Sequence, residues 1–246
     1  MSPSSSNGSF ALALLGIAET FRVCAPTLVE AAVGTLTRAT CDARLDAWSR
    51  RLLREAAIDL HVHDRHVVPP NETFVVMSNH QSLFDIPVLF QALAPMTLRM
   101  VAKTELYRIP VFGRTLTIAE FVELDRRDKG KARASLALAQ KRLHSGINVW
   151  IAPEGTRSPT GRLAPFKGGG FKLARDTGSR ILPVTIEGTR RVMAAKAATV
   201  RRGQRVDVTV HPPVDASGDR EALVAAVRAA IVSALPPELR DDARAP

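Results

Sequence analysis

The sequence predicts an α/β fold: a single layered domain with a mostly parallel mixed sheet flanked by helices, preceded by N-terminal amphipathic helices. Three observations support this prediction. The 246 residues are 46% hydrophobic, which is enough for one sizeable core. From residue 57 onward, short β-rich runs alternate with longer helical runs. No structural repeat or long linker divides the chain, so we expect one domain over residues 57–236.

The N-terminal part predicts helices after a short tail. Residues 1–9 are Ser-rich and predict a disordered tail, and residues 10–56 predict a helical region that can contact a membrane. The apolar run 10–18 lacks a basic leader and is too short to span a bilayer, and Glu30 interrupts the next apolar run, residues 25–37. Near Trp48, apolar Leu residues recur among Arg residues, a pattern that is typical of a basic amphipathic helix. Such a helix either lies in the membrane interface or packs on its own domain.

The pattern after residue 57 predicts each further element in turn. In residues 58–63, apolar positions alternate with polar ones, as in a half-buried strand. Further β-rich runs predict strands at residues 73–77, 98–102, 121–124, 148–152, 181–186 and 205–211. Helical patterns predict helices at residues 82–94, 129–144, 168–177 and 219–235. Residues 237–246 predict a frayed C-terminus, and the order of the strands is not readable from the sequence.

Composition narrows the classes of partner. Lys and Arg number 34 against 24 Asp and Glu, and the net charge of +10 favours phosphate, nucleic acid or anionic lipid. A single Tyr and the lack of an aromatic-rich strand motif argue against a nucleic-acid-binding module. The two cysteines do not make a disulfide framework, which favours a reducing, cytoplasm-facing location. His61, His63 and His66 are typical of the polar face of a strand and its exit, so no metal is implied.

A His and an Asp follow the predicted strand at residues 73–77. If Ser82 caps the next helix, His80 lies in the preceding turn and Asp85 lies in the first helical turn, close enough to accept a hydrogen bond from the imidazole. This pair has the base and the orienting acid of a catalytic triad without its nucleophile. Ser82 and Asp85 also have the spacing of a capping box, so both interpretations stay open on spacing alone.

A second polar loop follows the predicted strand at residues 148–152. After Glu154, Gly155 allows close approach of the backbone, Thr156 offers a hydroxyl, and Arg157 presents a planar fork suited to phosphate. The alternative is a solvated turn that ends at Ser158. The same four residue types recur at positions 187–190, where we expect them to end a core strand.

In order along the chain, these segments resemble the glycerophospholipid acyltransferase family over residues 57–215. The blocks that carry the resemblance are Asn79-His80-x-x-x-x-Asp85 with Pro87, Lys103-x-Glu105-Leu106 leading to Leu124-Asp125-Arg126, Pro153-Glu154-Gly155-Thr156-Arg157-Ser158, and Ile181-Leu182-Pro183-Val184. Four blocks in order are far more specific than any one of them.

The resemblance implies an enzyme that moves a fatty acyl group from acyl-CoA or acyl carrier protein to the free hydroxyl of 1-acyl-glycerol-3-phosphate, giving phosphatidic acid. It implies that His80, held by Asp85, deprotonates this hydroxyl directly, without a covalent acyl-enzyme and without a cofactor. The residues implied to hold the glycerol phosphate are Arg126, Glu154, Gly155, Thr156 and Arg157. Lys103 is the candidate for stabilising negative charge near the reacting carbonyl.

Other readings stay open beside this one. The same chemistry on another acceptor, such as a lyso-ornithine lipid or another lysophospholipid, fits the sequence equally. A hydrolase with Ser82 or Ser158 as nucleophile is disfavoured because neither lies in a Gly-x-Ser-x-Gly elbow. A pseudoenzyme that only binds membranes is a further alternative. The expected location is the cytoplasmic face of a membrane, with peripheral or monotopic attachment.

Overall fold

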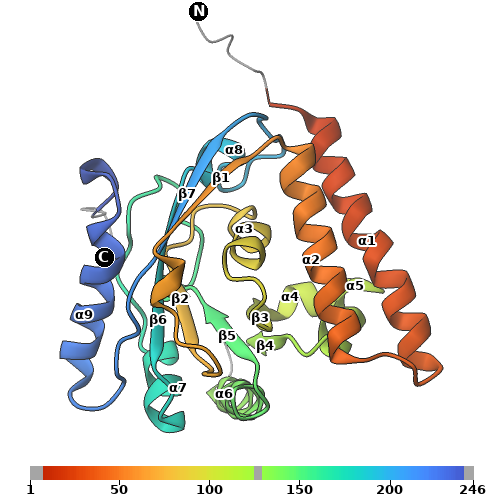
Figure 1. Ribbon diagram of the computed structural model, residues 1–246. Coiled ribbons are helices and arrows are strands. Elements are labelled where there is room, and N and C mark those ends of the chain that lie inside the picture. The colour runs from red at the N-terminus through yellow and green to blue at the C-terminus, as the bar shows by residue number, and fades with distance from the viewer. Residues whose placement is uncertain (1–7, 125–128, 241–246) are drawn as a thin grey trace, which may run out of the picture.

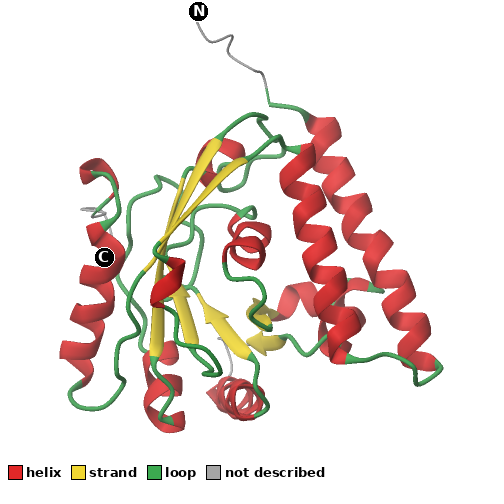
Figure 2. Cartoon of the chain, viewed as in Figure 1, coloured by secondary structure: helices red, strands yellow, loops and turns green. Residues whose placement is uncertain are grey.

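The computed structural model describes residues 8–124 and 129–240. Helices pack on both sides of a central sheet (Figures 1 and 2). The helices are α1 (Phe10–Ala32), α2 (Arg38–Glu55), α3 (Asp85–Ala92), α4 (Thr104–Tyr107), α5 (Phe112–Ile118), α6 (Lys129–His144), α7 (Gly169–Thr177), α8 (Thr189–Val192) and α9 (Arg220–Ser233). The strands are β1 (Asp59–His63), β2 (Val75–Ser78), β3 (Leu98–Lys103), β4 (Val122–Leu124), β5 (Asn148–Ile151), β6 (Ile181–Glu187) and β7 (Arg205–Val210).

Within the described ranges, the strands form one seven-stranded sheet with the order β1-β7-β6-β2-β5-β3-β4. Strands β2 to β6 are parallel to one another, whereas β7 pairs antiparallel with β6 and parallel with β1. The predicted mixed, mostly parallel sheet is therefore confirmed. Because β2 to β6 are parallel, their carboxyl ends lie at one edge of the sheet, where ligands of open α/β sheets usually bind.

Side chains around β2 show how the sheet is buried on both faces. Phe74 and Val76 contribute to the core shared with α2 and α3, whereas Val75 and Met77 contribute to the core shared with α7 and α9. All four side chains are inaccessible to solvent. This continuous apolar run is typical of a parallel strand covered by helices on both sides, and it holds the end of β2 in a rigid position.

α1 and α2 lie side by side and form a helical hairpin on one side of the sheet (Figure 1). The apolar run 10–18 and residues 25–32 of the second run belong to one continuous helix of 23 residues. By length and composition, α1 could cross a membrane. The expectation that this region lacks a segment of sufficient length is therefore wrong, because the charges at Glu19 and Glu30 pair with Arg51 and Arg44 of α2 and do not end the helix.

The apolar face of α2 points into the protein. Trp48 packs edge-on against Phe90 of α3, with a distance of 6.2 Å between ring centroids, and it donates a hydrogen bond to Thr20 of α1. Leu53 is buried in the core. Of the two alternatives for this helix, packing on its own domain is confirmed, and insertion of its Trp and Leu side chains into a membrane is wrong.

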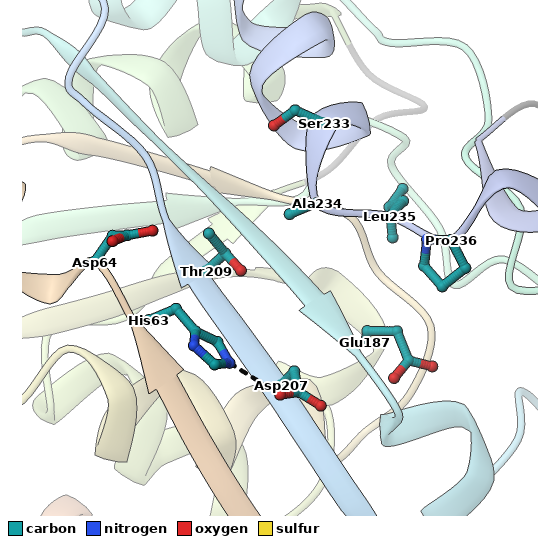
Figure 3. Close-up of a pocket in the computed structure, with 9 residues that line it drawn as sticks. All are labelled: His63, Asp64, Glu187, Asp207, Thr209, Ser233, Ala234, Leu235 and Pro236. Carbon is teal, nitrogen blue, oxygen red and sulfur yellow. Dashed lines mark hydrogen bonds and ion pairs between the residues drawn. The ribbon is translucent and has the colours of Figure 1, made fainter.

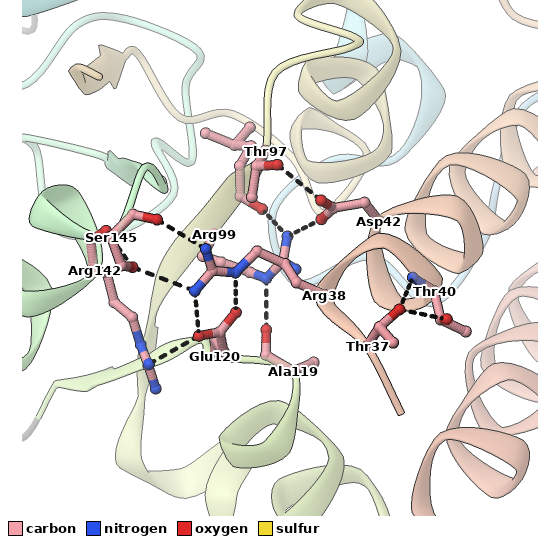
Figure 4. Close-up of polar contacts among 11 residues, drawn as sticks. Thr37, Arg38, Thr40, Asp42, Thr97, Arg99, Ala119, Glu120, Arg142 and Ser145 are labelled. Carbon is pink, nitrogen blue, oxygen red and sulfur yellow. Dashed lines mark hydrogen bonds and ion pairs between the residues drawn. The ribbon is translucent and has the colours of Figure 1, made fainter. Parts of the chain in front are cut away.

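A polar network fixes the start of α2 to the base of the sheet (Figure 4). Arg99 of β3 is completely buried and pairs with Asp42 of α2 at 2.7 Å, and Thr97 donates to the same carboxylate at 2.7 Å. Beside this pair, Arg38 binds Glu120 at 2.7 Å and lowers the pKa of that carboxyl group. The helical hairpin is therefore held to the domain by ion pairs as well as by apolar packing.

Both ends of the described chain are tied to the domain. Ser9 caps α1 through the N–H group of Leu12 and pairs with Val200 as an isolated bridge. Leu239 accepts a hydrogen bond from the backbone N–H of Leu163 at 2.9 Å. Order therefore begins before the predicted boundary at residue 10 and extends past residue 236. Residues 1–7 and 241–246 of the predicted tails lie outside the described residues.

Candidate active site

The loops that follow β2, β5 and β6 meet at the carboxyl edge of the sheet. β2 leads to His80, its neighbour β5 leads to Glu154 and Arg157, and its other neighbour β6 leads to Thr189. Lys103 is the last residue of β3, which pairs with β5. The sheet thus gathers side chains that are up to about a hundred residues apart in sequence, as expected where parallel strands end together.

His80 and Asp85 form the predicted hydrogen bond. The distance between His80 Nδ1 and Asp85 Oδ2 is 2.7 Å, and the Asp85 side chain is completely buried while that of His80 is 16% exposed. The imidazole also packs edge-on against Trp150, with 5.3 Å between ring centroids. Nothing in the described ranges forms a hydrogen bond with His80 Nε2, so this nitrogen is free to accept a proton from a bound hydroxyl.

Asp85 also organises the turn between His80 and α3. Its Oδ2 atom accepts hydrogen bonds from the backbone N–H groups of Gln81 at 2.7 Å and Ser82 at 2.9 Å. Ser82 is not the N-cap residue of α3, because this helix begins at Asp85. The Ser82 hydroxyl donates to the carbonyl of Met193 and accepts from the N–H group of Phe84. The acid of the apparent capping box therefore holds the turn and orients the imidazole at once.

Glu154 lies under the His80 turn. Its two carboxylate oxygens accept hydrogen bonds from the backbone N–H groups of His80 at 2.7 Å and Ala164 at 2.9 Å. The Ser158 N–H group donates to the His80 carbonyl at 2.8 Å, so both backbone groups of His80 are held by the loop after β5. Burial raises the pKa of the Glu154 carboxyl group to about 7. These contacts place Glu154 as a support for His80, which differs from the phosphate contact expected from the sequence.

Other expected binding residues lie in more open positions. Gly155 has a φ of 79°, which L side chains rarely adopt, and it turns the chain so that Thr156 is exposed. Arg157 is half-buried and Lys103 is exposed, and neither cation has an ion-pair or hydrogen-bond partner in the part of the chain that the structure describes. Arg126 lies outside the described residues, two positions after the end of β4.

The structure adds two side chains that the sequence analysis did not assign. Asn79 joins the end of β2 to β6, since its amide donates to the carbonyl of Ile186 at 2.7 Å and accepts from the same residue's N–H group at 2.8 Å. Thr189, which belongs to the second Glu-Gly-Thr-Arg sequence, donates a hydrogen bond to Asp85. The sequence contained one signal for Thr189: Glu-Gly-Thr-Arg occurs after two strands, β5 and β6, and both strands end at the same edge of the sheet.

A separate depression of about 500 Å³ lies between β1, β6, β7 and the end of α9 (Figure 3). Its polar lining includes His63, which contacts Asp207 at 2.9 Å, and Glu187. The guanidinium group of Arg205 keeps the pKa of Asp207 well below its usual range. None of the described candidate site residues lines this depression. Across the described ranges, no group of three or more His, Cys, Asp or Glu side chains is placed to hold a metal ion.

Comparison with known proteins identifies the family. The sequence model of the Acyltransferase family matches residues 59–187. The 1-acyl-sn-glycerol-3-phosphate acyltransferase of Borreliella burgdorferi is 31% identical over 184 residues, which cover 73% of each chain. A protein of the same name from Chlamydomonas reinhardtii is 34% identical over 172 residues, or 70% of this chain and 51% of that one.

A solved structure gives the same result. The crystal structure of the 1-acyl-sn-glycerophosphate (LPA) acyltransferase PlsC from Thermotoga maritima superposes with a TM-score of 0.70 at 30% identity, covering 79% of this chain and 78% of that one. By contrast, this chain spans about half the length of the algal relative (51%) and of a chloroplast relative from Brassica napus (42%). The family match, the bacterial relative and the shared fold together show that the chain belongs to the Acyltransferase family.

Proposed function

We propose that this protein transfers a fatty acyl group from an acyl thioester to the free hydroxyl of 1-acyl-glycerol-3-phosphate, giving phosphatidic acid. The observation that carries the proposal is the His80–Asp85 pair, which lies at the edge of the sheet where Arg157 and Lys103 also lie. Among the described residues, the His80 Nε2 atom and these two cations have no hydrogen-bond or ion-pair partner. The names of the similar proteins support the same substrate.

The chemical step follows from the position of the pair. The acceptor oxygen attacks the thioester carbonyl, so that a C–O bond forms and the C–S bond breaks, while the hydroxyl proton moves to Nε2 of His80. Asp85 stabilises the resulting imidazolium, which returns the proton to the departing thiolate. Since a thioester is already activated, this route requires a base and charge stabilisation but no cofactor.

The acceptor phosphate would bind between the loop after β5 and the end of β3. In the loop after β5, Arg157 offers a planar set of hydrogen-bond donors and Thr156 offers a hydroxyl. Gly155 allows the backbone of this loop to approach the phosphate closely. Lys103 lies on the neighbouring strand and adds positive charge to this side of the site. Arg126 stays a prediction for the same site. Glu154 contributes indirectly, through the backbone of His80.

We also propose that the protein is attached to the cytoplasmic face of a membrane in a peripheral or monotopic manner. Large apolar side chains of α1 are exposed at helical spacing, namely Phe10, Leu14, Ile17 and Phe21, with exposed fractions of 40% to 57%. The opposite side of α1 forms ion pairs with α2, a strongly polar helix. These pairs favour a hairpin that lies along the membrane surface, because α1 could not enter the bilayer alone without breaking them.

The test is the release of free thiol from palmitoyl-CoA and from palmitoyl-acyl carrier protein in mixed micelles, with a panel of acceptors. The panel contains lysophosphatidic acid, a lyso-ornithine lipid, a neutral lysophospholipid and uncharged monoacylglycerol. We expect turnover with lysophosphatidic acid, and His80→Ala should lower it by about 100-fold or more, since a general base contributes this much. His66→Ala is the matched control, because His66 is exposed and outside the site.

Each outcome of the panel has a defined meaning. Thiol release confined to lysophosphatidic acid supports both the reaction and the acceptor. Release with another lysolipid instead keeps the chemistry and rejects the acceptor. Release that His80→Ala leaves intact would overturn the mechanism, and release without any acceptor would indicate a thioesterase.

A further inference from the structure

Thr189 is a buried residue at the carboxyl edge of the sheet that the proposed reaction does not yet use. It is completely inaccessible to solvent, and its Oγ1 atom lies 2.5 Å from Oδ1 of Asp85. An ionised carboxylate can only accept hydrogen bonds, so the threonine hydroxyl is the donor. Thr189 therefore contacts the carboxylate on the oxygen that does not bind His80.

The surrounding chain holds Thr189 in this position. The chain turns sharply at Gly188, just after the end of β6, with a φ of 102°. Only glycine fits there, because a Cβ atom would lie 2.3 Å from the Arg205 carbonyl oxygen. Before this turn, the Asn79 side chain clamps Ile186. After it, Met193 accepts the hydrogen bond from the Ser82 hydroxyl. The segment with Thr189 is thus fixed on both sides to the loop that carries His80.

The two oxygens of Asp85 are used differently. Oδ2 accepts hydrogen bonds from His80 and from two backbone N–H groups, whereas Thr189 is the partner of Oδ1 in the described structure. A buried carboxylate oxygen without a donor is costly. If the hydroxyl is removed, the carboxylate group can relieve this cost by rotating about its Cβ–Cγ bond, which would move Oδ2 away from His80 Nδ1.

We propose that Thr189 is a positioning residue for acyl transfer: it holds Oδ1 of Asp85 so that Oδ2 stays aligned with His80 Nδ1 and Nε2 faces the acceptor hydroxyl. The proposal deepens the proposed function and rests on the catalytic use of His80. The second Glu-Gly-Thr-Arg sequence, residues 187–190, then helps to position the general base His80, while the first, residues 154–157, lies beside the expected phosphate site.

Steady-state kinetics of Thr189→Val and Thr189→Ser provide the first test. Thr189→Val removes the hydroxyl and should lower kcat by about 10- to 100-fold, as for other residues that orient a reacting group, with KM for both substrates within about twofold. Thr189→Ser keeps a hydroxyl and should restore most of kcat. The matched control is Thr185→Val on β6, the strand that leads to Thr189, because Thr185 is also buried but donates to the Ile231 carbonyl and contacts His211. It should lower the melting temperature and leave kcat unchanged.

The second readout is independent of activity. Proton NMR of the imidazole N–H groups should show a low-field signal for the His80–Asp85 hydrogen bond, assigned by its loss in His80→Ala. Thr189→Val should shift or broaden this signal, and Thr189→Ser and Thr185→Val should not. An unchanged signal in Thr189→Val, or a kcat that falls as far in Thr189→Ser as in Thr189→Val, would overturn the proposal. If the wild type were inactive with every acceptor, the proposed function would fail, and the NMR comparison would still decide whether Thr189 positions the pair.

Discussion

The carboxyl group of Glu154, which binds the backbone of His80, is buried and has a pKa of about 7. The ordinary value of 4.5 is raised chiefly by burial, and the two backbone N–H groups that bind the carboxylate offset only part of this effect. Since the folded state prefers the protonated form, this group stabilises the fold at low pH. Its contribution is complete below pH 4.5 and is lost as the pH rises through about 7.

This linkage predicts the pH dependence of stability. The difference between 4.5 and about 7 corresponds to about 3 kcal/mol of unfolding free energy, which the wild type should lose between about pH 4 and pH 8. Glu154→Gln carries no titrating group, so its unfolding free energy should lack this decline. Chemical denaturation of both proteins across the pH range measures the difference. Parallel curves for the two proteins would show that Glu154 does not titrate in this range.

The sequence predicted the His80–Asp85 contact but not the residues that support it. The four intervening residues are few enough that the geometry of one turn decides the contact, so local spacing was sufficient. Thr189 and Glu154 reach the same turn from other strands. Their contacts depend on the order of the strands, which the sequence does not encode locally. Both residues lie in Glu-Gly-Thr-Arg sequences, but they come from different strands, so Glu154 binds the backbone of His80 and Thr189 binds the side chain of Asp85.

At the scale of single elements, an ion pair between the completely buried Arg99 of β3 and the partly exposed Asp42 holds α2 to the sheet. Asp42→Ala would leave the guanidinium of Arg99 buried without its carboxylate, and we expect a loss of about 3 kcal/mol of unfolding free energy. Asp176→Ala on α7 is the control, since Asp176 forms an exposed pair with Lys172 and its loss should cost about 1 kcal/mol or less. Equal effects in urea denaturation would show that Arg99 gains other partners.

The longer elements were predicted well, and the shorter ones were missed. Each of the seven strands in the described chain was expected within about two residues, because each is either an apolar run or an alternation of apolar and polar residues. α4 and α8 contain four residues each, and α5 contains seven. A helix this short completes too few turns to show an apolar period, and Pro110 makes the region before α5 look like a loop. Packing against α1 and β4 stabilises α5.

At the scale of the whole molecule, the exposed apolar side of α1 governs attachment to lipid. Replacing Phe10, Leu14 and Ile17 together by Ser should weaken binding to anionic vesicles by about 10-fold or more, given the apolar area that each side chain can bury. Co-sedimentation with vesicles of phosphatidylglycerol and phosphatidylcholine measures the change. Val62→Ser, an exposed apolar residue on β1, is the control. Unchanged binding of the triple variant would exclude α1 as the attachment surface.

The order of the strands also determines which piece of the chain can fold alone. The family match ends at residue 187, yet β1, which lies inside the match, pairs with β7, which lies beyond it. A fragment cut to residues 59–187 would keep His80 and Asp85 but would leave β1 unpaired and Oδ1 of Asp85 without its donor. Any minimal version of this protein must therefore extend at least through Val210, the end of β7. Recognising the family from sequence requires less of the chain than building its active site.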